Sequence, residues 1–136
     1  MVYTVRMKPS IFTMIIKGEI PCHKVYEDDR IFAFMDIHPI QPGHILVVPK
    51  IQVDQFQDLP EEDYVALWAT VKKIAKKQKE VLKRGRVGIH VVGVDIPHAH
   101  VHVFPFDTMP EYRTVVDKSI PPDHKALAEM AARLFL

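Results

Sequence analysis

The sequence predicts an α+β domain. Short runs of strand-forming residues separated by turns, one long amphipathic stretch and a period-two stretch with three histidines support this fold class. With 136 residues and a hydrophobic fraction of 48%, the chain is long enough to bury one core without disulfides. We therefore expect a single domain over residues 1–136.

The expected helices are defined by their caps and by the spacing of apolar residues. Ser10 can cap a short N-terminal helix over residues 11–17, which Gly18 ends. One long helix is expected over residues 60–83, because its first turn is acidic, its last turn is rich in lysine and its apolar residues recur at helical spacing. A C-terminal amphipathic helix is expected over residues 123–134, with an aspartate as its N-cap.

Each expected strand is a short run of apolar and β-branched residues that a turn or a proline ends. Asp28 and Asp29 form a turn between the first two strands, and Gln41-Pro42-Gly43 precedes the third. Residues 106–122 are rich in proline and are expected to be irregular. The five expected strands cover residues 23–27, 30–36, 44–48, 86–92 and 98–104.

Charge and cysteine content narrow the classes of function. The net charge of +1 gives no reason to expect a nucleic acid or a membrane surface as a partner. Cys22 is the only cysteine, so the chain has no internal disulfide and suits a reducing compartment. The apolar residues 11–16 are too few to span a membrane or to form the centre of a signal peptide. We therefore expect a cytoplasmic protein.

The most informative stretch is Pro-His-Ala-His-Val-His-Val-Phe-Pro at residues 97–105. On a strand, His98, His100 and His102 project from one face and the apolar residues between them from the other. Burying three imidazoles is unfavourable unless each finds a hydrogen-bond partner, so this row is expected to line a pocket. The residues alone leave two uses open: a zinc site, or a nucleophile that attacks a phosphoryl group with help from neighbouring imidazoles.

Two motifs add a family resemblance. The first is Ile-Phe-Thr-Met-Ile-Ile-Lys-Gly-Glu-Ile-Pro (11–21), followed by Phe-Met-Asp-Ile-His-Pro (34–39) and Pro-Gly-His-Ile-Leu-Val-Val-Pro-Lys (42–50). The second is His-Ala-His-Val-His-Val-Phe (98–104). With both motifs in this order, the chain resembles the histidine triad (HIT) family of nucleotide hydrolases and transferases over a core of about residues 10–105, with a C-terminal extension over 106–136.

The resemblance implies a HIT-like fold: a five-stranded, mainly antiparallel sheet with one long helix, a short N-terminal helix and a C-terminal helix. It further implies a hydrolase of the nucleotide-binding, phosphoramidase-like branch. Such an enzyme cleaves a purine nucleoside monophosphate from its leaving group through a covalent nucleotidyl-histidine, and it needs no cofactor. Two alternatives remain: a dinucleoside polyphosphate hydrolase, or a nucleotide-binding HIT protein with little turnover.

The resemblance also assigns roles to individual residues. His100 corresponds to the nucleophile and His102 to the residue that hydrogen-bonds the phosphate oxygens. His98 and His44 correspond to histidines that orient the nucleophile and relay protons, and Asp36 to the acceptor for the ribose hydroxyls. An apolar slot for the purine base would consist of Ile11, Phe12, Ile15, Phe34 and Ile37.

Two departures from the family pattern change the expected site. Ser10, Thr13 and Gln52 stand where many bacterial members carry cysteine and histidine ligands for a structural zinc, so no metal is expected. The loop before the triad is short, with Gly93 and Asp95 at the positions that would contact the phosphate. A carboxylate there would repel the phosphate unless it is paired or protonated.

The resemblance implies a homodimer formed through the long helix and an edge strand. Tyr64 and Trp68 on that helix are expected at the interface. The remaining histidines are not assigned to the site, although His38 next to Asp36 is a candidate for the pocket mouth. These residues are His23, His38, His90 and His124.

Overall fold

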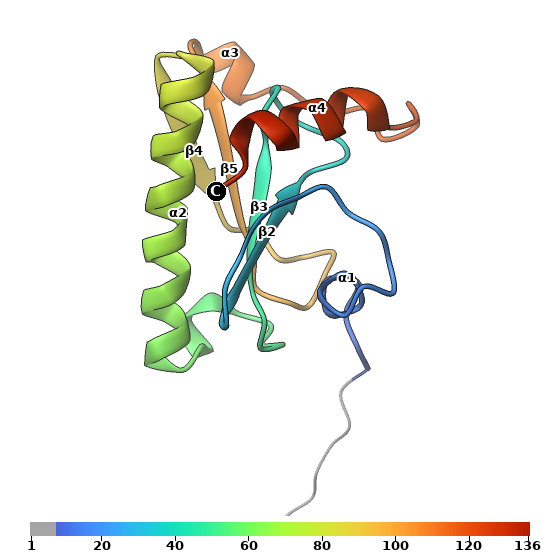
Figure 1. Cartoon of the computed structure of the whole chain (residues 1–136), viewed down its shortest axis with the longest axis vertical. Coiled ribbons are helices and arrows are strands. Elements are labelled where there is room, and N and C mark those ends of the chain that lie inside the picture. The colour runs from blue at the N-terminus through green and yellow to red at the C-terminus, as the bar shows by residue number, and fades with distance from the viewer. Residues whose placement is uncertain (1–7) are drawn as a thin grey trace, which may run out of the picture.

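The computed structural model describes residues 8–136, which form one five-stranded sheet flanked by helices (Figure 1). The strand order is β1-β2-β3-β5-β4 and every neighbouring pair is antiparallel, so the predicted α+β class and sheet are confirmed. The strands are β1 (Lys24–Glu27), β2 (Ile31–Met35), β3 (Ile45–Pro49), β4 (Arg86–His90) and β5 (Val101–Phe106). The helices are α1 (Ile11–Ile16), η1 (Phe56–Asp58), α2 (Glu61–Leu82), α3 (Met109–Tyr112) and α4 (His124–Leu134).

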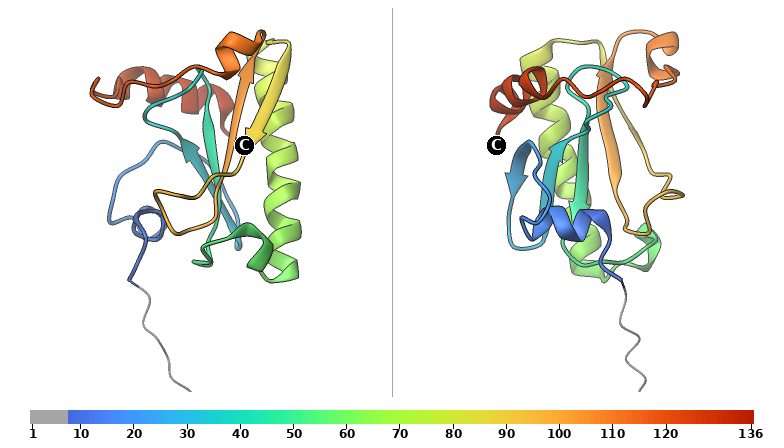
Figure 2. Two further views of the ribbon diagram at one scale, coloured as in Figure 1. Left: turned by 180° about the vertical axis from the view of Figure 1, so that it is seen from behind. Right: turned by 90° about the vertical axis from the view of Figure 1, so that its right-hand side faces the viewer.

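The sheet has two differently covered faces, and α1 and α2 lie on opposite sides of it (Figure 2). The back face packs against α2 and α4 in a large apolar cluster, because alternate strand residues point toward these helices. The front face carries a smaller cluster beneath α1, together with the histidine of β5. Back-face residues include Ile31, Ala33, Met35, Ile45, Val47, Val101 and Val103; the front cluster consists of Phe12, Phe32, Phe34, Leu46 and Val48.

The predicted helix caps are confirmed. The Ser10 side chain accepts a hydrogen bond from the amide of Thr13, and the Asp123 side chain accepts one from Ala126. The long helix α2 has three acidic residues in its first turn, as its dipole favours. Within residues 8–136, no helix combines the length and the apolar character that crossing a bilayer requires.

The start of β5 differs from the prediction. The expected strand begins at residue 98, whereas β5 begins only at Val101. The preceding Ala99 amide donates a 2.7 Å hydrogen bond to the carbonyl of Val53 in a loop. The first two histidines of the triad therefore lie on the segment that leads into the strand, and only the third lies on the strand itself.

The end of β5 also differs, because Pro105 lies within the strand instead of ending it. Pro105 pairs with Val87 of β4, while β3 pairs with β5 only as far as Val103. Beyond Val103, β5 pairs only with β4 among the strands of residues 8–136. The absent amide hydrogen of Pro105 therefore removes no hydrogen bond to β3. The remaining predicted strands and helices agree with the structure to within two residues at each end.

The C-terminal extension is more regular than predicted. Residues 106–122 contain α3, whose N-cap Thr108 and third residue Glu111 form a capping box. This motif was readable in the sequence as Thr-Met-Pro-Glu. The apolar side of α4 then packs in the same back-face cluster as α2.

Candidate functional site

The histidines of the triad gather on the front face of the sheet, around the beginning of β5. His102 pairs with Leu46 of β3 on one side and with His90 of β4 on the other. The rings of His100 and His102 are 5.1 Å apart. The structure thus brings the second and third triad histidines together, on two consecutive front-facing positions.

His100 is held with one ring nitrogen bonded and the other available. Its Nδ1 lies 2.7 Å from the carbonyl oxygen of His98, an acceptor, so Nδ1 carries the proton and donates. Nε2 then keeps its lone pair. Burial lowers the pKa of His100, with opposing contributions from the His98 carbonyl and Asp36, so the ring is neutral at neutral pH. A neutral imidazole with an unprotonated Nε2 is a competent nucleophile.

His44 and His102 form a second hydrogen-bonded unit. The amide of Ile40 donates to Nδ1 of His44 at 3.0 Å, so the proton of this ring is on Nε2. His44 Nε2 lies 2.9 Å from His102 Nδ1 and donates to it, which leaves the proton of His102 on its own Nε2. Burial is the main cause that lowers the pKa of both rings to about 3, so both are neutral. His102 can therefore donate a hydrogen bond from Nε2.

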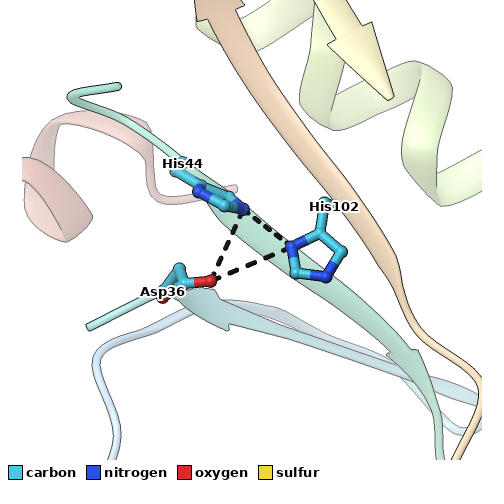
Figure 3. A group of neighbouring side chains, drawn as sticks. All are labelled: Asp36, His44 and His102. Atoms are coloured by element: carbon cyan, nitrogen blue, oxygen red, sulfur yellow. Dashed lines mark hydrogen bonds and ion pairs between the residues drawn. The ribbon is translucent and has the colours of Figure 1, made fainter. Parts of the chain in front are cut away.

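Asp36 lies beside this pair, directly after β2 (Figure 3). Its Oδ1 accepts a 2.8 Å hydrogen bond from the amide of His38, and its Oδ2 lies 3.5 Å from His44 Nε2 and 3.9 Å from His102 Nδ1. Burial raises the pKa of Asp36, although the hydrogen bond from the His38 amide and the positive charge of Lys118 oppose the rise. The carboxyl keeps oxygen lone pairs that can accept hydrogen bonds from neutral hydroxyls.

Asp36, His44 and His102 have the residue types of a metal site, and one candidate ligand atom of each lies within 4.8 Å of the others. The hydrogen bonds argue against this use. Because the Ile40 amide donates to His44 Nδ1, His44 Nε2 carries a proton and offers no lone pair to an ion. The cluster is therefore suited to hydrogen bonding rather than to ligation.

His98 is buried and is bonded at both ring nitrogens. Nε2 donates to the carbonyl of Pro49 at 2.7 Å, and Nδ1 accepts from the Ser10 hydroxyl at 2.6 Å. The hydroxyl of Thr13 and the amide of Ser10 both donate to Oε1 of Gln52, at 2.7 and 2.9 Å. The three residues at the family's zinc-ligand positions thus form one hydrogen-bonded cluster around the first triad histidine.

The residues of the predicted apolar slot are only partly brought together. Phe12 and Phe34 contact each other at 5.7 Å between ring centres, and Phe12 also packs against the His100 ring at 4.8 Å. Ile15 packs against the same front cluster, and Ile11 is 47% exposed. Ile37, 44% exposed, lines a separate cavity of about 270 Å³ between the loop after β2 and the start of α4.

The loop before the triad holds the last two predicted residues. Gly93 has a φ of +72°, a left-handed conformation that suits glycine, and Asp95 is exposed. No hydrogen bond within residues 8–136 joins either of them to a histidine. Their part in phosphate binding stays a prediction.

Sequence reasoning missed His90. This residue of β4 lies opposite His102 with ring centres 4.5 Å apart, and its ring also contacts Phe104. Burial lowers its pKa, with a smaller contribution from the neighbouring His100. Only the register between β4 and β5 reveals this proximity. The site therefore contains a further histidine from the neighbouring strand.

The C-terminal extension also reaches the site. Tyr112 of α3 stacks on Phe104 at 5.4 Å, and Gln41 donates a hydrogen bond to the carbonyl of Glu111. Lys118 lies near enough for its charge to act on both Asp36 and His102, in addition to the larger effect of burial. No signal in the sequence pointed to these contacts.

Comparison with known proteins agrees with this geometry. An uncharacterised HIT-like protein of Methanocaldococcus jannaschii is 40% identical over 103 residues, 70% of this chain and 77% of that protein. The adenosine 5'-monophosphoramidase of Schizosaccharomyces pombe is 36% identical over 100 residues, 70% of this chain and 72% of that protein. A solved structure of a HIT-like protein from Bartonella henselae has a TM-score of 0.83 at 29% identity, covering 96% of this chain and 97% of that one.

The family model of the HIT domain matches residues 17–109, more than half of the chain. This range contains Asp36, His44 and all three histidines of the triad. The chain therefore belongs to the HIT family.

Proposed function

We propose that this protein is a hydrolase that cleaves a purine nucleoside monophosphate from an amine or related leaving group through a covalent nucleotidyl-His100 intermediate. The observation that carries the proposal is the hydrogen bond from His100 Nδ1 to the His98 carbonyl, which leaves Nε2 unprotonated beside His102. The name of the similar Schizosaccharomyces pombe protein, an adenosine 5'-monophosphoramidase, supports this choice of leaving group.

In the first step, His100 Nε2 attacks the α-phosphorus, a phosphorus–nitrogen bond forms and the bond to the leaving group breaks. The ring becomes an imidazolium whose Nδ1–H remains on the His98 carbonyl, and the leaving amine takes up one proton from solvent. In the second step, water attacks the phosphorus, His100 leaves as a neutral ring and the water's proton returns to solvent. The protons therefore balance over the cycle.

The other residues would bind and stabilise. His102 Nε2–H would donate to the phosphoryl oxygens as their charge rises, and His44 would keep His102 in the tautomer that can donate. His98 would orient the nucleophile through its carbonyl. Asp36 would accept the ribose hydroxyls. The base would lie against Ile11, Phe12, Ile15 and Phe34, and it would reach Ile37 only at the edge of that group, with Gly93 and Asp95 toward the phosphate.

The test is hydrolysis of a panel that contains an adenosine 5'-phosphoramidate, ADP and a diadenosine polyphosphate, with rapid-quench mass spectrometry for an adenylated peptide containing His100. We expect the phosphoramidate to turn over fastest and the adduct to accumulate transiently. Preference for the diadenosine substrate would show instead that the protein is a dinucleoside polyphosphate hydrolase. Nucleotide binding without any turnover would make the protein a binding module.

We also propose a cytoplasmic homodimer in which residues 10–105 and the extension 106–136 form a single domain. The extension shares the back-face core, because Leu127 and Leu134 pack in the same cluster as α2. Within the described residues 8–136, the edge strand β4 pairs with a strand on one side only, and Val65 of α2 is 56% exposed. A free Cys22 suits the reducing cytoplasm.

A further inference from the structure

Gln78 is a buried polar residue on α2, the helix behind the sheet. Its side chain is fully buried, and its Nε2 donates two hydrogen bonds of 2.9 Å, to the carbonyls of Gly43 and Val103. Its Oε1 is buried with no hydrogen-bond partner within residues 8–136. An unpartnered buried acceptor is destabilising. The favourable contribution of this side chain therefore comes from its two donor bonds.

The two carbonyls belong to the segments that carry the hydrogen-bonded histidine pair. Gly43 immediately precedes His44, and Val103 immediately follows His102. The two segments are neighbours in the sheet, because β3 and β5 pair through Ile45 and Val103. The planar side-chain amide of Gln78 thus bridges the backbone before β3 and the backbone of β5, next to His44 and His102.

The contact between α2 and Gly43 is close. Gly43 has a φ of +92°, and a Cβ added to it would meet Leu82 Cδ1 at 2.4 Å. Leu82 lies four residues after Gln78, so both side chains project from the same face of α2. The helix therefore contacts the lead-in to β3 through two consecutive turns.

We propose that Gln78 is a positioning residue for the His44–His102 pair. The amide holds the two backbone segments from behind the sheet at the separation at which His44 Nε2 donates to His102 Nδ1, 2.9 Å away. A relative displacement of one ångström would break that hydrogen bond. Without it, His102 is no longer fixed in the tautomer that donates from Nε2. The effect on catalysis rests on the function proposed above; the effect on the histidine pair does not.

The test is Gln78→Met, which keeps the side-chain volume and removes both donors together with the unpartnered oxygen. We expect kcat for the adenosine phosphoramidate to fall by about tenfold to a hundredfold, the scale that small misplacement of a catalytic group produces, with KM within about twofold of wild type. In the free protein, the ring ¹⁵N signals of His44 and His102 should shift toward a mixture of tautomers, while those of His98 stay unchanged.

The matched control is Thr70→Val, on the same helix and also buried, whose hydroxyl donates to the carbonyl of Ala66 within α2. It should lose stability without changing the histidine signals or kcat. Should Gln78→Met not fold, Gln78→Asn takes its place, since it keeps the amide one methylene short of the carbonyls.

Unchanged histidine signals in a folded Gln78 variant would overturn the proposal. Signals that shift equally in Thr70→Val would overturn it too, because the effect would then reflect general loosening of the helix. If the wild-type protein hydrolyses no nucleotide in the panel, the proposed function fails, while the ¹⁵N measurement still decides the role of Gln78.

Discussion

At the scale of single residues, backbone groups make chemically alike histidines distinct. The Ile40 amide places the proton of His44 on Nε2, and the carbonyls of His98 and Pro49 place those of His100 and His98 on Nδ1 and Nε2. A backbone amide can only donate and a backbone carbonyl can only accept, so each of these partners fixes which ring nitrogen carries the proton. One histidine is left with an available lone pair beside another that donates.

Replacing the nucleophile should separate turnover from binding. In His100→Ala, we expect turnover below about 1% of wild type, because the substitution removes the Nε2 that would form the bond to phosphorus. The Kd for AMP should change much less, since the carboxyl and the apolar residues around the site are intact. Steady-state kinetics and calorimetric titration check this. Activity of more than a few per cent would point to direct attack by water.

Stability should depend on pH through the buried neutral histidines. The pKa of His44 and of His102 falls from 6.5 to about 3 on folding, so between these values the unfolded chain binds more protons than the folded one. The free energy of unfolding is therefore at its full value above about pH 6.5 and decreases as the pH falls toward 3. Urea titrations between about pH 7 and about pH 5 measure this slope.

The variant His44→Gln supplies the control for that slope. Removing one of the two rings should make the free energy of unfolding less dependent on pH, whatever its effect at a single pH. His124→Gln, which removes an exposed histidine, should leave the slope close to that of wild type. Equal slopes in wild type and His44→Gln would show that the pair does not govern the acid sensitivity.

At the scale of elements, the sequence predicted the type and order of the main helices and strands because hydrophobic period and caps are local signals. It could not predict that β5 runs through Pro105, because this depends on how far β3 extends beside it. The same holds for His90, whose place in the site is a matter of register. Within the candidate site, Asp36 and His44 were found by motif, whereas Gln78 carries no local signal.

Helix α1 is connected to the site by its own N-cap. Ser10→Ala removes the cap bond to Thr13 and the hydroxyl donor to His98, so we expect a loss of about 1–3 kcal/mol of stability and a lower kcat. Asp123→Ala, which removes only the N-cap bond of α4, should lose about 1 kcal/mol and keep kcat. Chemical denaturation and steady-state kinetics measure both. An unchanged kcat in Ser10→Ala would contradict a link between the cap and the nucleophile.

Metal removal should leave the fold unaffected. The Ser10 hydroxyl bonds to His98, and the Thr13 hydroxyl and the backbone amide of Ser10 donate to the side-chain oxygen of Gln52. Hydroxyl and amide groups are poor ligands for zinc compared with thiolates. We expect a chelator to leave Tm unchanged and elemental analysis to find far less than one zinc per chain. About one bound zinc per chain, lost together with stability, would refute this.

At the scale of the whole molecule, the two edges of the sheet differ. β1 contacts α4, and the C-terminal Leu136 amide donates to the carbonyl of Val25. β4 forms the other edge, and Ile89 on it is 43% exposed. Tyr64 and Val65 on α2 add further exposed apolar surface. Among residues 8–136, β4 pairs with a strand on one side only, and together with the exposed apolar side chains of α2 it is the kind of surface that a second copy covers by two-fold symmetry.

Sedimentation should therefore give about twice the chain mass of 15.7 kDa at micromolar concentration. Val65→Glu places a charge on the exposed side of α2 and should shift the protein toward monomer. The monomer itself should remain folded, because Val65 is already 56% exposed within a single chain. The control is Val115→Glu, at a position in the C-terminal extension that is 92% exposed, which should leave the mass unchanged. A wild-type monomer, or equal dissociation in both variants, would show that α2 does not form the contact between copies.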